Sequence, residues 1–296
     1  MRTQHTPGCT GTEKDSFRIT DLNHRIATRE FRYLHCHQCG LYRLEDVPEN
    51  LGDYYPDEYY ELPTLGQLAK VAAADPFKIT TVQRFISRGR LLEIGPAYGT
   101  FAYQAKEAGF EVDVIEMDAR CCDYLNRVVG VNAVCSSAPH VAMQGMRKHD
   151  VIALWHVIEH LPDPWVLLRE AATNLAPGGI LVIAAPNPDA WQFRVMGKAW
   201  PHLDAPRHLY LIPQSALTNY AGILGLTRLH CSTTDSDAKS WNRFGWQRLL
   251  MNAVRSKSLQ WVAYILGYMF SIVVSPIESH ELNGSAYTLV FRKPDK

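Results

Sequence analysis

The sequence has no excess of charge of either sign. Lys and Arg together number 30, and so do Asp and Glu, which gives a formal net charge of zero. Proteins that bind nucleic acids usually carry a basic excess, so we expect no nucleic-acid partner. The first seven residues lack the apolar core of a signal peptide. The longest apolar run, 261–274, is interrupted by Gly267 and Ser271, is followed by Pro276, and falls short of the roughly 20 residues that cross a bilayer. We therefore expect a cytoplasmic protein.

The sequence also lacks a second Cys-x2-Cys pair. Disulfides are rare in the cytoplasm, so the seven cysteines are expected to be thiols or metal ligands. Cys36 and Cys39 form the only Cys-x2-Cys-Gly segment, and two thiolates at this spacing can share one tetrahedral zinc ion. His5 and Cys9 are candidates for the other two ligands, and either histidine flanking Cys36 is an alternative. A small hairpin whose cysteines bind no metal is the competing interpretation. We expect a zinc-ribbon-like element over residues 1–45 and a helical linker over 46–88.

Residues 90–188 alternate between apolar strand-like runs and helical segments. Apolar runs of this kind, separated by helices, are typical of parallel strands buried on both faces. The pattern predicts an α/β fold with a doubly wound sheet. The expected strands are at 90–94, 111–116, 131–135, 150–155, 180–185, 226–232 and, running antiparallel, 285–292.

A glycine turn follows the first of these strands. Gly95 and Gly99 allow a sharp bend, after which Thr100 begins a helix, so backbone N–H groups face a ligand. The turn alone is compatible with a dinucleotide, a flavin or S-adenosylmethionine. It has no middle glycine, so it is poorly suited to a pyrophosphate. Glu116 ends the next strand about 20 positions later, where an acid accepts hydrogen bonds from ribose hydroxyls. The alternative for Glu116 is a solvated carboxylate.

Histidines gather after the fourth expected strand. His156, Glu159 and His160 are spaced to share one face of a helical turn, and His208 could join them from a later segment. The residue types of the group are compatible with three roles. Glu159 and His160 could form a structural pair, His160 or His208 could act as a general base towards an acceptor hydroxyl, or the set could bind a divalent metal.

Four segments, in order and spacing, resemble the class I S-adenosylmethionine-dependent methyltransferases. They are the glycine turn at 92–101, the acid Glu116, the histidine block at 155–164 and Leu-Ala-Pro-Gly-Gly-Ile-Leu at 175–181. Pro-Arg-His-Leu-Tyr at 206–210 resembles a bacterial subgroup. That subgroup carries an N-terminal zinc-ribbon-like cysteine segment followed by a tyrosine-rich stretch, here 54–60. One cysteine of that pattern is missing.

The resemblance implies a seven-stranded Rossmann-like sheet and S-adenosylmethionine as the cofactor. Glu93 and the turn would line the methionine end, Glu116 would hold the ribose, Met117 and Ser136 would flank the adenine, and Trp155 and His156 would close over the cofactor. The implied cofactor-binding set is Glu93, Gly95, Pro96, Ala97, Tyr98, Gly99, Thr100, Glu116, Met117, Ser136, Trp155 and His156. The implied catalytic set is His156, Glu159, His160 and His208.

Residues 191–296 are expected to form an acceptor lid, a helical insertion and the last strands. In the lid, Trp191 and Trp200 could stack on a planar or sugar ring or simply pack together. In the insertion, basic and aromatic residues precede the apolar run. Residues 241–276 could therefore contact a membrane surface peripherally, or form a packed hairpin or a dimer interface.

Together these features predict an enzyme that methylates a hydroxyl group. The expected acceptor is a small metabolite, a sugar or glycan, or a lipid-linked compound. Two alternatives remain: an NAD-dependent oxidoreductase, and a non-catalytic cofactor-binding protein that binds a partner through its ribbon. The sequence does not indicate an oligomeric state.

Overall fold

The structure, a computed structural model, describes residues 5–55 and 61–295. Its larger sheet has seven strands in the order β10-β11-β8-β7-β4-β5-β6. Strands β4 to β8 are parallel, and β11 runs antiparallel to both of its neighbours. The doubly wound prediction is confirmed. The bounds are β4 Arg90–Ile94, β5 Glu111–Glu116, β6 Asn132–Cys135, β7 His149–Trp155, β8 Leu175–Pro186, β10 Thr227–Ser232 and β11 Ala286–Arg292.

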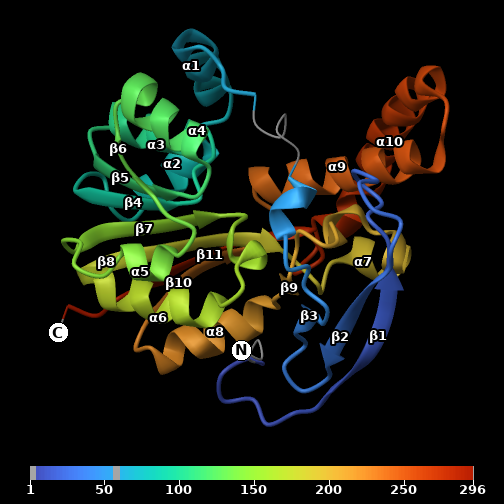
Figure 1. The fold of residues 1–296 in the computed structure, drawn as a ribbon, viewed down its shortest axis with the longest axis horizontal. Coiled ribbons are helices and arrows are strands. Elements are labelled where there is room, and N and C mark those ends of the chain that lie inside the picture. The colour runs from blue at the N-terminus through green and yellow to red at the C-terminus, as the bar shows by residue number, and fades with distance from the viewer. Residues whose placement is uncertain (1–4, 56–60, 296) are drawn as a thin grey trace.

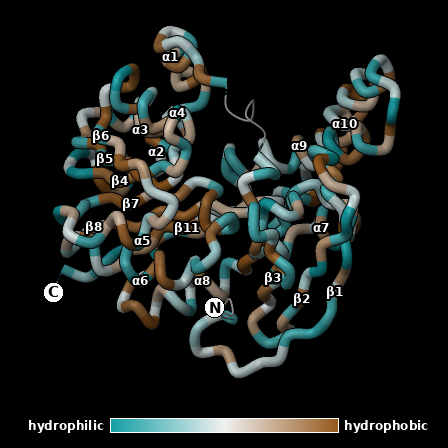
Figure 2. Tube along the Cα trace, in the orientation of Figure 1, coloured by the Kyte–Doolittle hydropathy of each residue, from teal (hydrophilic) through white to brown (hydrophobic). Residues whose placement is uncertain are grey.

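Helices cover both faces of this sheet (Figure 1). On one side lie α1 Leu65–Ala74, α2 Phe77–Gln83, α3 Thr100–Glu107 and α4 Ala119–Tyr124, and on the other lie α5 Pro139–Ala142, α6 Pro164–Asn174 and α8 Gln214–Ile223. The central strands are hydrophobic along their length (Figure 2), because side chains on both of their faces are buried. The Leu-Ala-Pro-Gly-Gly-Ile-Leu segment lies inside β8, whose register with β7 shifts between His149 and Val151.

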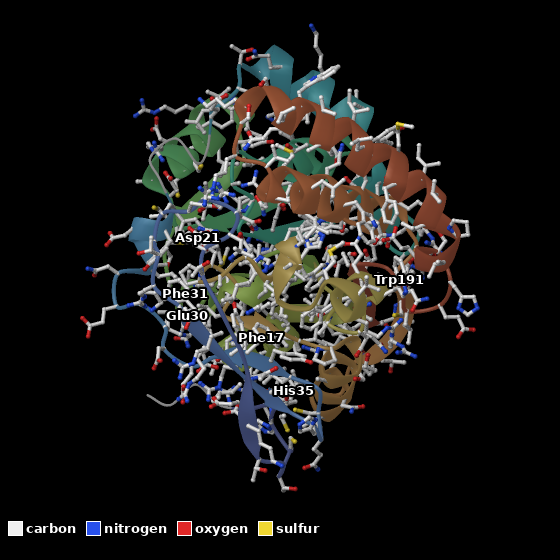
Figure 3. All side chains as sticks on the ribbon, turned by 90° about the vertical axis from the view of Figure 1, so that its right-hand side faces the viewer. Phe17, Asp21, Glu30, Phe31, His35 and Trp191 are labelled. Carbon is white, nitrogen blue, oxygen red and sulfur yellow. The ribbon has the colours of Figure 1, made fainter. Side chains whose placement is uncertain are left out.

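The N-terminal residues form a second sheet of four antiparallel strands, β1-β2-β3-β9. They are β1 Glu13–Ile19, β2 Phe31–Cys36, β3 Tyr42–Leu44 and the short β9 Tyr210–Leu211. In Figure 3, Phe31, Phe17 and His35 follow one another down these strands, and Asp21, which follows β1, lies above them. Because β9 comes from the expected lid, the N-terminal sheet and the lid are one packed unit. The end of the tyrosine-rich stretch, residues 56–60, lies outside the described residues.

The insertion between β10 and β11 is a pair of helices, α9 Ser236–Ala253 and α10 Lys257–Glu278. One expectation was wrong here: the apolar run belongs to a helix of 22 residues that includes Pro276, so it does not fall short of the length that crosses a bilayer. A proline so near the C-terminal end of a helix removes one hydrogen bond without breaking the earlier turns. By length and composition alone, α10 is the one helix in the described ranges that could cross a membrane.

The lid begins with α7 Trp191–Met196 and two short 3₁₀ turns, Gly197–Ala199 and Pro201–Leu203. Trp200 is fully buried. Its ring stacks on Phe193 with centroids 5.0 Å apart, and its Nε1–H donates to Gln192. Of the two roles considered for Trp200, the structure therefore shows packing.

A buried arginine joins the lid to the N-terminal segment. The Arg207 guanidinium is fully buried and donates to Asp21 at 2.8 Å and to both carboxylate oxygens of Asp204 at 2.8 Å. Its Nη1 also donates to the carbonyl of Tyr54 at 3.2 Å. Although burial opposes ionisation, the hydrogen bonds from Arg207 hold the pKa of Asp204 well below its usual value. The Arg207 guanidinium thus holds together three chain segments, which contain Asp21, Tyr54 and Asp204.

Arg207→Ala should therefore destabilise the fold strongly. It leaves two buried carboxylates without their cation, which costs about 3–5 kcal/mol of unfolding free energy. Arg207→Lys should give an intermediate loss, because lysine keeps the charge but not the planar fork. Urea denaturation followed by circular dichroism measures both. Arg127→Ala, which breaks an exposed pair with Asp123, should have little effect; similar losses at both arginines would contradict the assignment.

Candidate functional site

The glycine turn connects β4 to α3 and takes left-handed backbone conformations at three positions. The φ angles are +66° at Gly95, +53° at Ala97 and +82° at Gly99. A Cβ at Gly95 would lie 2.7 Å from Cγ2 of Val157, so a side chain there would collide with the loop after β7. The turn and the histidine block, which are distant in sequence, are therefore in direct contact.

Two buried carboxylates lie beside this turn. Glu93, on β4, is 3% exposed, and its Oε2 has no hydrogen-bond partner within the described residues. Burial raises the pKa of Glu93 to about 7, against the opposing effect of Lys78. Glu116, at the end of β5, accepts N–H groups from Ala97 at 2.9 Å, Met117 at 2.6 Å and Asp118 at 2.9 Å. Burial raises its pKa too. Ionisation of the Glu93 and Glu116 carboxyl groups is therefore unfavourable unless a positively charged group lies beside them.

The remaining residues expected at the cofactor lie along the same edge of the sheet. Met117 is 67% exposed just past β5. Ser136 follows β6, and its backbone N–H donates to the carbonyl of Glu116 at 2.8 Å. Trp155 ends β7 and packs edge-on against Phe101, with centroids 5.4 Å apart. Its indole N–H is buried without a partner among the described atoms. The structure therefore brings the predicted set, including Pro96, Tyr98 and Thr100 of the turn, to the carboxyl ends of four neighbouring strands.

Glu159 is the centre of the histidine cluster. It lies in a 3₁₀ turn, Ile158–His160, directly after β7, and is 1% exposed. Neither of its carboxylate oxygens has a hydrogen-bond partner in the part of the chain described. His156 Nδ1 is 3.8 Å from Oε1, and His208 Nε2 is 4.0 Å from the same atom. His160 and His208 are in edge-on contact, with centroids 4.6 Å apart. The four predicted catalytic residues are thus brought together.

The tautomers of these rings follow from their partners, because a carbonyl oxygen can only accept a hydrogen bond. His160 Nδ1 is 3.0 Å from the carbonyl of Arg207, and His208 Nδ1 is 2.8 Å from the carbonyl of His202. Each Nδ1 must therefore carry a proton, which leaves Nε2 with a lone pair. Burial lowers the pKa of His160 to about 4 and also lowers the pKa of His208. Both rings are neutral at physiological pH and able to accept a proton.

His156 is held from the helical insertion. Its φ of +56° is unusual for a residue other than glycine. Its Nε2 is 2.6 Å from Oδ2 of Asp237, in the first turn of α9, and its ring stacks on Trp241 at 4.0 Å. Although burial raises the pKa of Asp237, His156 lowers it overall. Asp237 is thus an ionised acceptor for the Nε2–H of His156.

Sequence reasoning missed several residues of the site. Asp237 and Trp241 lie in the insertion, where no spacing or motif pointed to them. The Tyr55 hydroxyl is 3.0 Å from His160 Nδ1, and only its place in a tyrosine-rich stretch could have suggested a role. His202 supports His208 through its carbonyl, and its own Nε2 is 2.9 Å from the carbonyl of Trp241. Burial lowers the pKa of His202 to about 3.

The cysteine cluster is a separate arrangement at the far end of the N-terminal sheet. His5, Cys9, Cys36 and Cys39 place one ligand atom each within 4.8 Å of one another. Cys9 Sγ is 3.9 Å from Cys36 Sγ, and Cys39 Sγ is 3.8 Å from His5 Nε2. Although burial opposes ionisation, N–H groups of Cys39 and Gln38 lower the pKa of the Cys36 thiol to about 7. Burial raises the pKa of the Cys39 thiol to about 11.

Comparisons with known proteins all find similarity to methyltransferases. The model of a family described as "Methyltransferase domain" matches residues 70–230. Ubiquinone biosynthesis O-methyltransferases from Caulobacter sp. and Stutzerimonas stutzeri are 27% and 24% identical over 33% and 42% of this chain. The matched regions span 41% and 57% of those proteins, so the chain covers about half of the length of these relatives.

One solved structure covers nearly the whole chain. It is phosphoethanolamine N-methyltransferase 2 of Haemonchus contortus in complex with S-adenosyl-L-methionine, which is 14% identical. The match has a TM-score of 0.53 and includes 97% of this chain and 70% of the other. At this identity it shows the fold alone.

Proposed function

Because this chain belongs to the methyltransferase-domain family, we propose that it transfers the methyl group of S-adenosylmethionine to the hydroxyl group of an acceptor. The observation that carries the proposal is the pair of buried carboxylates, Glu93 and Glu116, beside the glycine turn. S-adenosylmethionine carries positive charge on its sulfur and its amino group, which these carboxylates would stabilise. A nicotinamide dinucleotide would bring a negatively charged pyrophosphate to the same place.

The residues present fit this cofactor. The carboxylate of Glu93 and the indole N–H of Trp155 are buried polar groups with atoms that lack a partner within the described residues, and such groups usually bind something. Glu116 Oε2 accepts one N–H, so it retains a lone pair for a ribose hydroxyl. Met117 and Ser136 lie at the neighbouring strand ends, where the adenine would follow the ribose.

The chain's own residues have to orient the acceptor, exclude water and take its proton. The donor's methyl group is already electrophilic, because it is bonded to a positively charged sulfur. When bound, S-adenosylmethionine would supply the methyl group, and Nε2 of His160 or His208 would accept the proton that the acceptor hydroxyl gives up. Asp237 and Trp241 fix the ring of His156 at the junction between cofactor and acceptor.

The acceptor class follows the same reasoning. A histidine base suits a hydroxyl acceptor, and the relatives named above are O-methyltransferases. A small metabolite, a sugar or glycan, and a lipid-linked compound all remain candidates.

A divalent metal is the second candidate for the histidine cluster. Glu159, His160 and His208 offer ligand atoms within 4.8 Å of one another. The other nitrogen of each histidine donates to a backbone carbonyl, which is the arrangement that orients metal-bound histidines. A metal there would orient the acceptor oxygen and lower its pKa.

The first test concerns cofactor binding. Gly95→Asp should abolish binding of S-adenosylhomocysteine, because the side chain would collide with Val157 and repel the cofactor's carboxylate. Isothermal calorimetry on the purified wild type should show binding of S-adenosylhomocysteine and none of NADH. Gly222→Ala is the matched control, since nothing lies within 4 Å of a Cβ at that position. Binding of NADH by the wild type would favour the oxidoreductase.

The second test concerns the base. His208→Asn should lower turnover by roughly 10²–10⁴-fold, since a positioned base contributes about that much, and should leave the affinity for S-adenosylhomocysteine nearly unchanged. The measurement is methyl transfer to a hydroxyl acceptor identified from metabolite extracts. Unchanged turnover would contradict the role of His208. Loss of wild-type turnover after chelation, restored by added Mg²⁺ or Mn²⁺, would identify the cluster as a metal site. Cofactor binding without methylation of any extract would favour the non-catalytic alternative.

We also propose that His5, Cys9, Cys36 and Cys39 bind one structural zinc ion. Zn–S bonds of about 2.3 Å place two sulfurs of a tetrahedron roughly 3.8 Å apart, which matches the 3.9 Å between Cys9 and Cys36. The lowered pKa of Cys36 favours the thiolate that zinc requires. His5 takes the place of the missing cysteine.

Purified protein should therefore contain one zinc ion per chain by mass spectrometry of metals. Cys39→Ser should remove the zinc and lower the unfolding temperature, because the metal stabilises only the folded N-terminal sheet. His5→Gln should weaken retention of the metal during chelation. Cys135→Ser, which changes an exposed cysteine at the end of β6 in the larger sheet, is the control. Equal zinc content in wild type and Cys39→Ser would rule out this site.

A further inference from the structure

On α10, the large apolar side chains face away from the protein and small residues face towards it. The side facing α9 and the body carries the small residues Ala263, Gly267 and Ser271. A Cβ at Gly267 would lie 2.5 Å from the Cα of Gln247, so the two helices are in close contact there. The large apolar side chains point outwards, and six of them are more than half exposed: Leu259, Trp261, Leu266, Met269, Ile272 and Val273. Soluble helices show the opposite arrangement, so this face requires an apolar environment.

The charged residues of the same hairpin are positive everywhere except at its two ends, Asp237 and Glu278. Between Asp237 and Glu278 the sequence has no acidic residue, whereas Lys or Arg occurs at positions 239, 243, 248, 255 and 257. Arg255 and Lys257 are exposed at the turn between the two helices. Arg25 adds its charge nearby, where its Nη2 donates to the carbonyl of Asn252 at 2.8 Å. Because the whole chain has no net charge, this concentration complements an anionic surface.

We propose that the α9–α10 hairpin docks the protein on the surface of an anionic lipid bilayer. Large apolar side chains flanked by basic residues are the combination that holds interfacial helices on such membranes. A second copy of the chain fits less well, because two such faces in contact would bring their positive charges together. The hairpin projects from the body (Figure 1), which leaves its outer face accessible to a flat surface.

The hairpin lies on the bilayer and does not cross it. α10 packs along α9, with Trp246 and Phe270 in edge-on contact at 4.5 Å. α9 carries Lys239, Arg243 and Arg248, which cannot enter hydrocarbon without a large cost. Only the outer face of α10 is therefore available to the lipid.

This docking bears on the acceptor, and that step rests on the proposed function. The first turns of α9 hold His156 through Asp237 and Trp241, so one helix connects the docking face to the site. A bilayer beneath α10 would then lie on the side of the molecule where α9 contacts the histidine cluster. Of the acceptor classes above, this favours a lipid-linked hydroxyl compound.

Flotation of the purified chain with vesicles tests the docking. The protein should float with phosphatidylcholine vesicles that contain phosphatidylglycerol, and binding should weaken as salt is added. Replacing both Arg255 and Lys257 by Glu should weaken binding on the order of twentyfold or more, because each basic residue near the surface contributes roughly fivefold. Replacing both Trp261 and Val273 by Ser should weaken binding at every salt concentration.

Matched controls lie on distant surfaces. Arg147→Glu and Val141→Ser change exposed residues of the same types and should leave flotation unchanged. All variants should bind S-adenosylhomocysteine in calorimetry as the wild type does, because none touches the predicted cofactor residues.

The possible results distinguish membrane docking from dimer formation, and also test the proposed methyl transfer separately. Failure to float at low salt, or flotation insensitive to both double variants, overturns the docking. A dimer in analytical ultracentrifugation that the Trp261 and Val273 double variant dissociates, without flotation, would assign the face to a second copy and also overturn it. Flotation without binding of S-adenosylhomocysteine would support docking and refute the proposed methyl transfer. Faster methylation of a lipid acceptor in anionic vesicles, lost in the double variants, would support the acceptor class.

Discussion

The arrangement of this site depends on one buried cation. Arg207 neutralises Asp21 from the N-terminal segment and Asp204 from the lid, and its own carbonyl accepts the N–H of His160. The next residue is His208, whose backbone carbonyl accepts the Tyr33 hydroxyl at 2.5 Å. A buried arginine pairs well with several carboxylates because its planar guanidinium donates in several directions. The same residue that joins the N-terminal segment to the lid therefore also sets the positions of two histidines.

Electrostatics distinguishes the two halves of the site. Around the glycine turn, Glu93 and Glu116 are buried acids with raised pKa values, which favours a positively charged ligand. Around Glu159, the histidines are neutral because burial disfavours their protonated form. Gly95 and Val157 are in contact at the boundary. The environment that favours a cationic ligand therefore adjoins a cluster of neutral histidines, which is the arrangement that the proposed methyl transfer requires.

The sequence predicted those parts of the molecule whose structure follows from the pattern of nearby residues. Alternating strands and helices, with the glycine turn at Gly95, indicated the sheet, and residues that end adjacent parallel strands must lie at one edge. Glu93, Glu116 and the histidine block could be grouped in this way. Contacts made by the insertion could not be predicted, because Asp237 reaches His156 only through the packing of α9. The pairing of β9 with β3, over two residues, likewise leaves no periodic signal.

The insertion is held in a fixed orientation by a buried polar network. Glu278, near the end of α10, accepts the Nε2–H of Gln192 from the lid at 2.7 Å and the indole N–H of Trp246 from α9 at 2.8 Å. Gln192 also donates to the carbonyl of Asn242 at 2.7 Å. Burial raises the pKa of Glu278, so the carboxylate depends on these donors. Because partly satisfied buried networks are costly, α9 and α10 cannot rotate away from the lid without losing several bonds together. The angle between the apolar face and the histidine cluster is therefore set by the fold, and a surface bound by α10 meets the site in one orientation.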